Sequence, residues 1–397
     1  MSEAIGTGIG WSAQADAGHA GKEAAEMARA ALPPRSPQLA LVFGSSWFDQ
    51  SSLLGGVHSV LGRTPLIGGS TAGEITPEGP SSHSCVILLL GSETLQWSVG
   101  IGEGVDGAPR EGGQQAAYQA MQHFSGQQRI GFLLFGDGLA SRYADVVRGI
   151  QEVLGTSSLV VGGLAGDDLR FSQTYQYCND RVASGAVVGV LLGGTGKIGV
   201  GIEHGFAPIS KPRRITRAHA NVLHELDGQP ATSVYEEYFG RDLMTQMQQT
   251  GFTRQRIAYP LGMRGETTDQ WLLRNVVAFK EDGSLSCSGE LLEGAWLQLM
   301  IGSRELALEA ARQAAQDAIR SLREVAAVLV FDSVARRTLL GERCAAEEVA
   351  CIRHIIGPSV PLIGCYTYGE QAPLRTSAIA GRTAIQTGAV LVVAVGT

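Results

Sequence analysis

The stretch that decides the fold reads PLIGGSTAGE at residues 65–74, because the chain repeats it. It returns as PLIGCYTYGE at residues 361–370, and a looser copy reads VVGGLAGDD at residues 160–168. We call these three stretches the signatures. Each has a short apolar run, a glycine-rich turn and a carboxylate just beyond. That pattern is typical of a buried strand that enters a tight turn.

The repeat extends well beyond the signatures. Apolar runs that predict strands lie upstream of each signature, at 39–43, 130–135 and 328–331, and downstream, at 86–90, 187–192 and 390–395. Alanine-rich segments with helical spacing precede each group, at 21–32, 112–123 and 304–322. The sequence therefore predicts an α/β protein of repeated βαβ-β units, in which mixed sheets are flanked by helices.

A glycine-alternating run follows the last predicted strand of the first two units, at 99–104 and 200–205. The turns between them predict antiparallel hairpins. The third unit stops without such a run, but Ile5–Gly10 at the start of the chain resembles it. We expect Ile5–Gly10 to pair with Val390–Val395 and so to cover an apolar edge.

Residues 206–303 do not follow the repeat. They predict an amphipathic helix entered at Pro230 and an antiparallel meander from Trp271 to Met300. We therefore divide the chain into residues 1–205 with two units, an inserted α+β module at 206–303, and the third unit at 304–397.

Composition limits the function. The 397 residues are 44% hydrophobic and carry a net charge of −7, which argues against a nucleic-acid-binding surface. No apolar run approaches the roughly 18 residues of a membrane helix. Six cysteines without a C-x-x-C pair are typical of reduced thiols. We expect a cytoplasmic protein that neither binds nucleic acid nor inserts into a membrane.

The signatures and several neighbouring motifs resemble those of FIST proteins. The similar stretches are 69–75, 137–139, 162–167, 204–209, 226–231 and 364–370. This resemblance covers nearly the whole chain. It implies a non-catalytic sensory domain of signal transduction that binds a small ligand, such as an amino acid or its derivative. Many FIST proteins carry fused output modules, for which we see no room here. We expect this chain to act on a separate partner such as a histidine kinase or a cyclic-di-GMP enzyme.

The signature turns are the candidate ligand site, because ligands collect beyond the carboxyl ends of strands in βα units. We expect the first and third signatures to meet across one cleft, with small residues facing an aromatic wall. The candidate ligand-binding residues are Ser70, Thr71, Glu74, Asp167, Tyr366, Thr367, Tyr368 and Glu370. In the alternative interpretation, the glycines serve strand packing and the carboxylates cap neighbouring backbone.

Two further functions stay open. Residues 68–72 approach the G-x-S-x-G nucleophile elbow, so a hydrolase using Ser70 is a weaker alternative, since Ala72 replaces the last glycine. A subset of FIST proteins resembles haem-based nitric oxide sensors. The chain has no C-x-x-C-H, so haem b would be bound non-covalently, with His204 as the candidate axial ligand.

Overall fold

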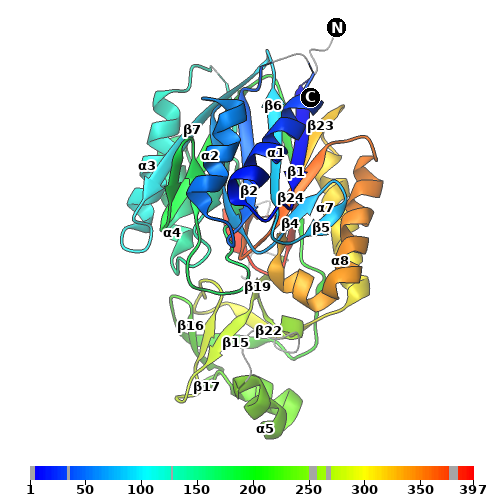
Figure 1. The fold of residues 1–397 in the computed structure, drawn as a ribbon. Helices are drawn as coiled ribbons and strands as arrows, with labels where there is room; N and C mark the ends of the chain where they lie inside the picture. The colour runs from blue at the N-terminus through cyan, green and yellow to red at the C-terminus, as the bar shows by residue number, and fades with distance from the viewer. Residues whose placement is uncertain (1–4, 34–35, 127, 250–256, 265–269, 375–382) are drawn as a thin grey trace.

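The structure is a computed structural model and describes residues 5–33, 36–126, 128–249, 257–264, 270–374 and 383–397. The repeated units form the upper body in Figure 1, with sheets inside and helices outside. The inserted residues form a separate lower module. The predicted α/β class, with mixed sheets flanked by helices, is confirmed.

Each unit has the same order of elements: a strand, a helix, a strand, a helix and four strands. The first unit comprises β1 (Gly6–Ser12), α1 (Ala17–Ala31), β2 (Leu39–Ser45), α2 (Gln50–Leu61), β3 (Leu66–Thr71), β4 (Glu74–Thr76), β5 (Gly79–Ser81) and β6 (Cys85–Gly91). The second comprises β7 (Leu95–Glu103), α3 (Pro109–Gln122), β8 (Arg129–Gly136), α4 (Tyr143–Leu154), β9 (Val160–Leu164), β10 (Gln176–Cys178), β11 (Arg181–Ala183) and β12 (Ala186–Gly194). The third comprises β13 (Lys197–Glu203), α7 (Arg304–Ile319), β23 (Val325–Ser333), α8 (Val334–Ile356), β24 (Leu362–Thr367), β25 (Glu370–Pro373), β26 (Thr383–Gln386) and β27 (Val390–Gly396).

The glycine-alternating runs open the units instead of closing them. β1 pairs with β6, β7 with β12, and β13 with β27, all antiparallel. The predicted hairpins and the predicted pairing of Ile5–Gly10 with Val390–Val395 are therefore wrong, and β13 occupies that edge. The reason is helix packing: a Cβ at Gly8 would lie 2.1 Å from the Ala28 carbonyl, and one at Gly201 would lie 1.9 Å from that of Ala314. Glycine lets each opening strand lie against the next helix of its own unit.

The three units also exchange hairpins. The strand orders of the three sheets are β1-β6-β2-β3-β10-β11, β7-β12-β8-β9-β25-β26 and β13-β27-β23-β24-β4-β5. The second unit thus completes the first sheet, the third completes the second, and the first completes the third. In each sheet the signature strand pairs parallel with the strand before it. Each signature therefore lies where the chain leaves one sheet and enters another.

The inner faces of the three sheets share one apolar core. At its centre lie Phe43, Phe135 and Phe331, one from each unit, all nearly fully buried. Their ring centroids are 5.2, 5.9 and 6.3 Å apart, which are ordinary distances for interacting aromatic rings. This contact fixes the units around a common centre.

The inserted module has its own sheet and its own core. Its elements are β14 (Phe206–Pro208), β15 (Arg213–His219), β16 (Val222–Leu226), β17 (Gln229–Pro230), α5 (Ser233–Gln249), β18 (Leu261–Arg264), β19 (Leu272–Arg274), β20 (Val276–Phe279), β21 (Leu285–Cys287) and β22 (Trp296–Gly302). The predicted helix begins at Ser233, because Pro230 pairs with Glu225 in the sheet. Within the predicted meander, residues 272–279 divide into two short strands, and β19 and β20 lie at opposite ends of the strand order.

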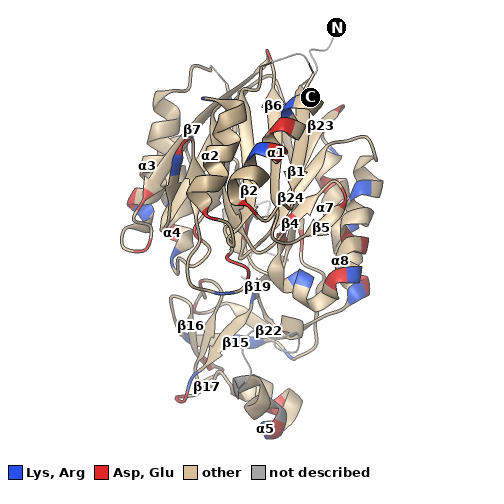
Figure 2. Ribbon diagram, in the orientation of Figure 1, with Lys and Arg blue, Asp and Glu red and all other residues tan. Residues whose placement is uncertain are grey.

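Charged residues lie mainly on the outward helices and on the loops, as Figure 2 shows. The strands of the three sheets carry few of them. Among the helices in the described parts of the chain, none combines the length and the apolar composition needed to cross a membrane.

Candidate functional site

The three signatures interlock through their backbones, and we call this arrangement the signature ring. Between the first and third signatures, Ala72 N–H donates to the Tyr366 carbonyl (2.9 Å) and Tyr366 N–H donates to the Gly73 carbonyl (2.7 Å). Between the third and second, Leu164 N–H donates to the Gly369 carbonyl (2.9 Å) and Tyr368 N–H donates to the Leu164 carbonyl (3.1 Å). Between the second and first, Gly166 N–H donates to the Ser70 carbonyl (3.1 Å). The first and third signatures do meet, and the second joins them. They touch directly, without a space between their backbones at these bonds.

Beside the ring, the first unit holds a buried carboxylate. Glu74 is fully buried, and its carboxylate accepts the hydroxyl of Thr71, the backbone N–H of Ser84 (3.1 Å) and the Ser84 hydroxyl (2.6 Å). Ser84 comes just before β6, so these bonds join the signature to the next central strand. Burial raises the pKa of Glu74 to about 7, against the opposing effect of its hydrogen bonds.

The other two units repeat this arrangement, which we call a latch. In the third unit, Glu370 accepts the Thr367 hydroxyl (2.7 Å) and the Ala389 N–H (3.2 Å). Burial raises the pKa of Glu370 well above its usual range. In the second unit, Gln176 donates to Thr174 (2.9 Å) and accepts the Ala186 N–H (3.1 Å). The three positions match in register, since each lies opposite the residue after the first glycine of a signature.

Six of the eight predicted ligand residues are fully buried in the ring and its latches, namely Ser70, Thr71, Glu74, Tyr366, Thr367 and Glu370. Asp167 is also fully buried, whereas Tyr368 is half-buried. This differs from the open cleft that we expected, and the alternative in which carboxylates cap neighbouring backbone describes Glu74 and Glu370. Tyr366 lies under the guanidinium of Arg337, 4.7 Å from its ring centre. Direct ligand contact by these six residues stays a prediction.

The remaining two, Asp167 and Tyr368, meet at a loop that we call the junction loop (residues 165–175). The Asp167 carboxylate accepts the backbone N–H groups of Phe171 (2.9 Å), Ser172 (2.6 Å) and Gln173 (3.0 Å), and the hydroxyl of Tyr368 (2.5 Å). Burial opposes ionisation, but the bonds from Tyr368 and the loop backbone outweigh it and lower the pKa of Asp167. These bonds favour the ionised carboxylate of Asp167, which shapes the loop.

The same loop reaches the first unit through residues that sequence reasoning missed. Asp168 accepts the hydroxyls of Ser45 (3.0 Å) and Ser46 (2.6 Å). Arg170 donates to the Ser46 carbonyl (3.1 Å) and hydroxyl (2.8 Å), and its guanidinium lies 5.6 Å from the ring centre of Trp47. The available signal was a serine pair and a tryptophan directly after a buried strand, at the end where ligands collect.

Bulky side chains on this loop are held outward by an unusual backbone. Leu169 and Phe171 have φ angles of 63° and 51°, in the left-handed region that bulky residues rarely adopt. Phe171 is 48% exposed and stacks on Tyr368 at 4.9 Å, and Trp47 is 63% exposed. Such backbone costs of order 1–3 kcal/mol per residue and gathers at functional sites. We call Ser46, Trp47, Arg170, Phe171 and Tyr368 the junction patch.

His204 lies half-buried after the end of β13. Its Nδ1 accepts the backbone N–H of Phe206 at 3.0 Å, so the neutral ring carries its proton on Nε2. An axial haem ligand has the opposite tautomer, in which Nδ1–H donates and Nε2 binds iron. The surroundings of His204 therefore do not fit axial ligation. The described residues also hold no group of three or more histidine, cysteine or acidic side chains placed to bind a metal ion.

The hydrolase alternative depends on Ser70, whose hydroxyl is already engaged. It donates to the Gly166 carbonyl (2.8 Å) and accepts the Tyr175 N–H (2.9 Å). Both partners are backbone groups, and neither can act as a general base. A nucleophilic serine needs a base within hydrogen-bond reach. The geometry gives this alternative no support.

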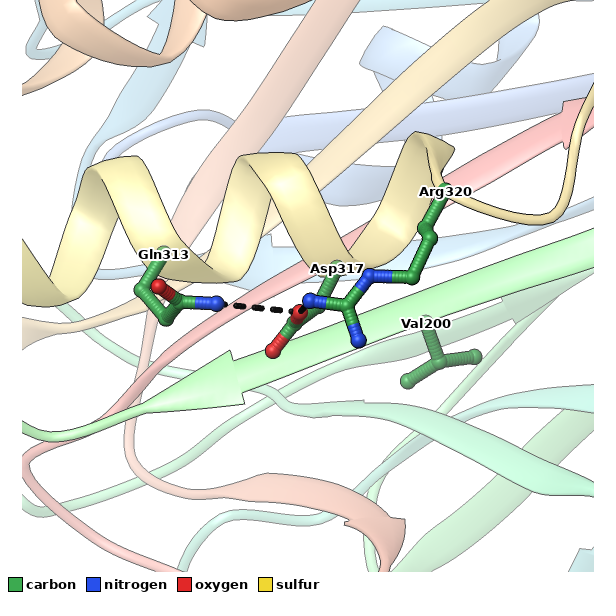
Figure 3. Close-up of a pocket in the computed structure, with 4 residues that line it drawn as sticks. All are labelled: Val200, Gln313, Asp317 and Arg320. Atoms are coloured by element: carbon green, nitrogen blue, oxygen red, sulfur yellow. Dashed lines mark hydrogen bonds and ion pairs between the residues drawn. The ribbon is translucent and has the colours of Figure 1, made fainter.

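A groove of about 500 Å³ lies away from the ring, between α7 and β13 (Figure 3). It is lined by Val200, Gln313, Asp317 and Arg320. Gln313 and Arg320 both donate to the Asp317 carboxylate, at 3.0 and 2.5 Å. None of the predicted site residues lines this groove, and its polar groups bond to one another.

Known proteins resemble this chain to different degrees. "Uncharacterized protein MJ1623" of Methanocaldococcus jannaschii is 29% identical over 191 residues, 43% of this chain. The matched segment spans only 34% of that relative. The crystal structure of a cyanuric acid hydrolase from A. caulinodans aligns over 99% of this chain and 100% of its own, at 11% identity and a TM-score of 0.39. A second cyanuric acid hydrolase structure covers 98% and 99%, at 9% identity and a TM-score of 0.34. Likeness at this level supports no inference about function.

Two family models match in succession, the FIST N domain at residues 38–229 and the FIST C domain at 231–373. Their boundary lies within the inserted module, and our division of the chain at 205 and 303 stays a prediction. FIST sensory domains are generally non-catalytic. Because the two matches together span most of the chain, the protein belongs to the FIST family of sensory-domain proteins.

Proposed function

We propose that this protein is a cytoplasmic sensor that binds a small polar ligand at the junction patch. The observation that carries the proposal is the junction loop, which joins all three units while holding Leu169 and Phe171 outward at a cost in backbone strain. The signal passes to a separate protein such as a histidine kinase or a cyclic-di-GMP enzyme, as the family resemblance implies.

The chemistry of the patch favours an amino-acid-like ligand. Arg170 is exposed and offers its guanidinium to a carboxylate, and Asp168 nearby offers an anion to an ammonium group. Trp47 and Phe171 supply apolar walls. A few polar anchors among aromatic walls are typical of small-ligand sites. The buried latches, including Glu74 and Glu370, lie behind this surface and hold its parts in register.

The cysteines support a reducing compartment. All six are free thiols, and Cys85, Cys178, Cys287 and Cys365 are buried. Proteins of oxidising compartments more often use cysteines in disulfides. We propose a cytoplasmic location on this ground.

The test is a thermal-shift screen against free amino acids and biogenic amines. Saturation at 100 times Kd stabilises the native state by about 2.7 kcal/mol, which raises Tm by several degrees. We expect the shift to be lost in Trp47→Ala. Tyr118→Ala, at a 57% exposed aromatic on α3, should keep it. No shift with any ligand of the panel, or an equal shift in Trp47→Ala, would contradict the proposal.

The haem alternative has its own readout. After haem is added to the purified protein, a Soret band that disappears in His204→Ala but persists in His123→Ala would favour a gas sensor. The bond from Phe206 N–H to His204 Nδ1 predicts that the two variants give the same spectrum as the parent.

A further inference from the structure

The latch of the third unit lies against a buried ion cluster that has no counterpart among the described residues of the other two units. Arg336 is fully buried, and its guanidinium donates to Asp332 (3.1 Å) and to Glu348. Asp332 lies opposite Tyr366, and the register puts Gly44 and Gly136 at the matching places. Glycine has no side chain to bind an arginine. The cluster is therefore specific to the third unit.

The same guanidinium holds both connections to the inserted module. Arg336 donates to the carbonyl of His204 at 2.6 Å and to that of Ala307 at 2.9 Å. His204 lies between β13 and β14, where the chain enters the module. Ala307 lies in the first turn of α7, just after β22 leaves it. A residue with several donors in a rigid fork is suited to fixing four acceptors at once.

The third latch contacts the Arg336 cluster through Thr367. Its Oγ1 lies 2.7 Å from the Glu370 carboxylate and 3.3 Å from the Asp332 carbonyl. Asp332 in turn binds Arg336 through its side chain. One hydroxyl thus lies between the latch carboxylate and the residue that orients the arginine.

A second contact runs from the other end of the latch. Glu370 accepts the N–H of Ala389, and two residues earlier Thr387 donates to the Leu273 carbonyl at 3.0 Å. The Thr387 hydroxyl also lies 2.9 Å from Ser288 Oγ. Leu273 and Ser288 both belong to the module. The latch of the first unit instead ends near Ser81 and Ser82, which bind Arg337 of α8.

We propose that the third latch couples the signature ring to the inserted module, so that a displacement of the ring changes how firmly the module is held. Tyr368 of the junction patch directly follows Thr367, so the patch and the latch are joined through the chain itself. The coupling deepens the proposed function by naming its output step, but it is a property of the unliganded chain. It can therefore be tested without any ligand.

The experiment compares Thr367→Val with Thr71→Val by hydrogen–deuterium exchange. Both changes remove the latch hydroxyl at matching positions, but only Thr367 connects to Arg336. We expect backbone amides in β14 and β22 to exchange at least about threefold faster in Thr367→Val, since loss of about 0.7 kcal/mol of local stability gives that factor. In Thr71→Val they should exchange at the parental rate. Equal rates in the two variants would overturn the proposal.

A double-mutant cycle sharpens the test. Arg336→Lys keeps the charge but cannot reach all four acceptors, so it should speed exchange in the same strands. Adding Thr367→Val to it should have no further effect, because the connection is already broken. Additive effects would overturn the proposal. If Arg336→Lys does not fold, Asp332→Asn, which removes the carboxylate that binds Arg336 on the route from Thr367, replaces it in the cycle. If no ligand shifts Tm but the two substitutions are non-additive, the proposed ligand site is rejected and the coupling between latch and module is supported.

Discussion

The latches of the first and second units make similar bonds through different groups. Glu74 joins Thr71 to the backbone before β6, and Gln176 joins Thr174 to the start of β12. A neutral amide therefore suffices to close a unit. The carboxylate of the first unit is not required by the fold, and its burial raises its pKa to about 7. The first and third units thus carry latch carboxylates, Glu74 and Glu370, whose ionisation is disfavoured by burial.

The third unit extends this difference. Its Glu370 also has a raised pKa because of burial, and it lies near the Asp332–Arg336–Glu348 cluster. Burial, followed by repulsion from Glu348, raises the pKa of Asp332. A buried cation among several acids is balanced only when some of the acids keep their protons. The three units thus share the same order of elements and differ in the ionisable groups at and near the latch.

The largest expected effect comes from removing the buried cation. Arg336→Met leaves Asp332 and Glu348 without their partner and two carbonyls without a donor, so it should lower the free energy of unfolding by about 3–5 kcal/mol. Arg343→Met, on the same helix with a side chain 92% exposed, should change it by less than about 0.5 kcal/mol. Urea unfolding measures both. Equal effects would mean that the cluster does not stabilise the third unit.

The second effect tests the comparison of the latches directly. The folded pKa of Glu74 is raised, so its stabilising contribution is present below pH 4.5 and is lost as pH rises through about 7. Glu74→Gln copies the second unit and should be about 3 kcal/mol more stable than the parent at pH 8.5, relative to their difference at pH 4.5. Unfolding curves at the two pH values measure this. A parent that gains stability relative to Glu74→Gln as pH rises would contradict it.

The reverse substitution should have a smaller effect. Gln176→Glu puts a carboxyl where the amide donates to Thr174, and a protonated acid can still make that bond. We expect near-parental stability at pH 4.5 and a loss of about 1–3 kcal/mol at pH 8.5, when a buried carboxylate replaces the amide. Gln176→Met, which cannot ionise, serves as the control. A loss that is independent of pH in Gln176→Glu would show that shape, not charge, limits this position.

The repeat was predictable because it is written in the sequence three times. Helices, central strands and the signatures follow from apolar spacing and glycine turns. The boundaries of the units were not predictable, because β6 and β7 are joined by a short turn that predicts a hairpin although the two strands enter different sheets. Only the contact of Gly8 and Gly201 with the helices distinguishes the two cases.

The candidate site was predictable in place but not in its parts. The signatures pointed to one end of the strands, and Asp167 and Tyr368 lie on the junction patch or next to it. Glu74 and Glu370 also follow a signature turn, but they lie in the latches and not at the junction loop, because β4 and β25 leave the signatures to join other sheets. Trp47 and Arg170 are far apart in sequence, and only the junction loop brings them together. Contacts between units cannot be predicted from the spacing of residues within one unit.

The central claim is that ligand binds at the junction patch and that the latch carboxylates only support it. The most direct measurement is the ligand-induced shift in Tm, at pH 6, of Glu74→Gln and Trp47→Ala side by side, with the best ligand of the amino-acid and amine panel. We expect Glu74→Gln to keep the parental shift, since a glutamine makes the latch bonds in the second unit. Trp47→Ala should lose it. A shift that is lost in Glu74→Gln and kept in Trp47→Ala would contradict the account.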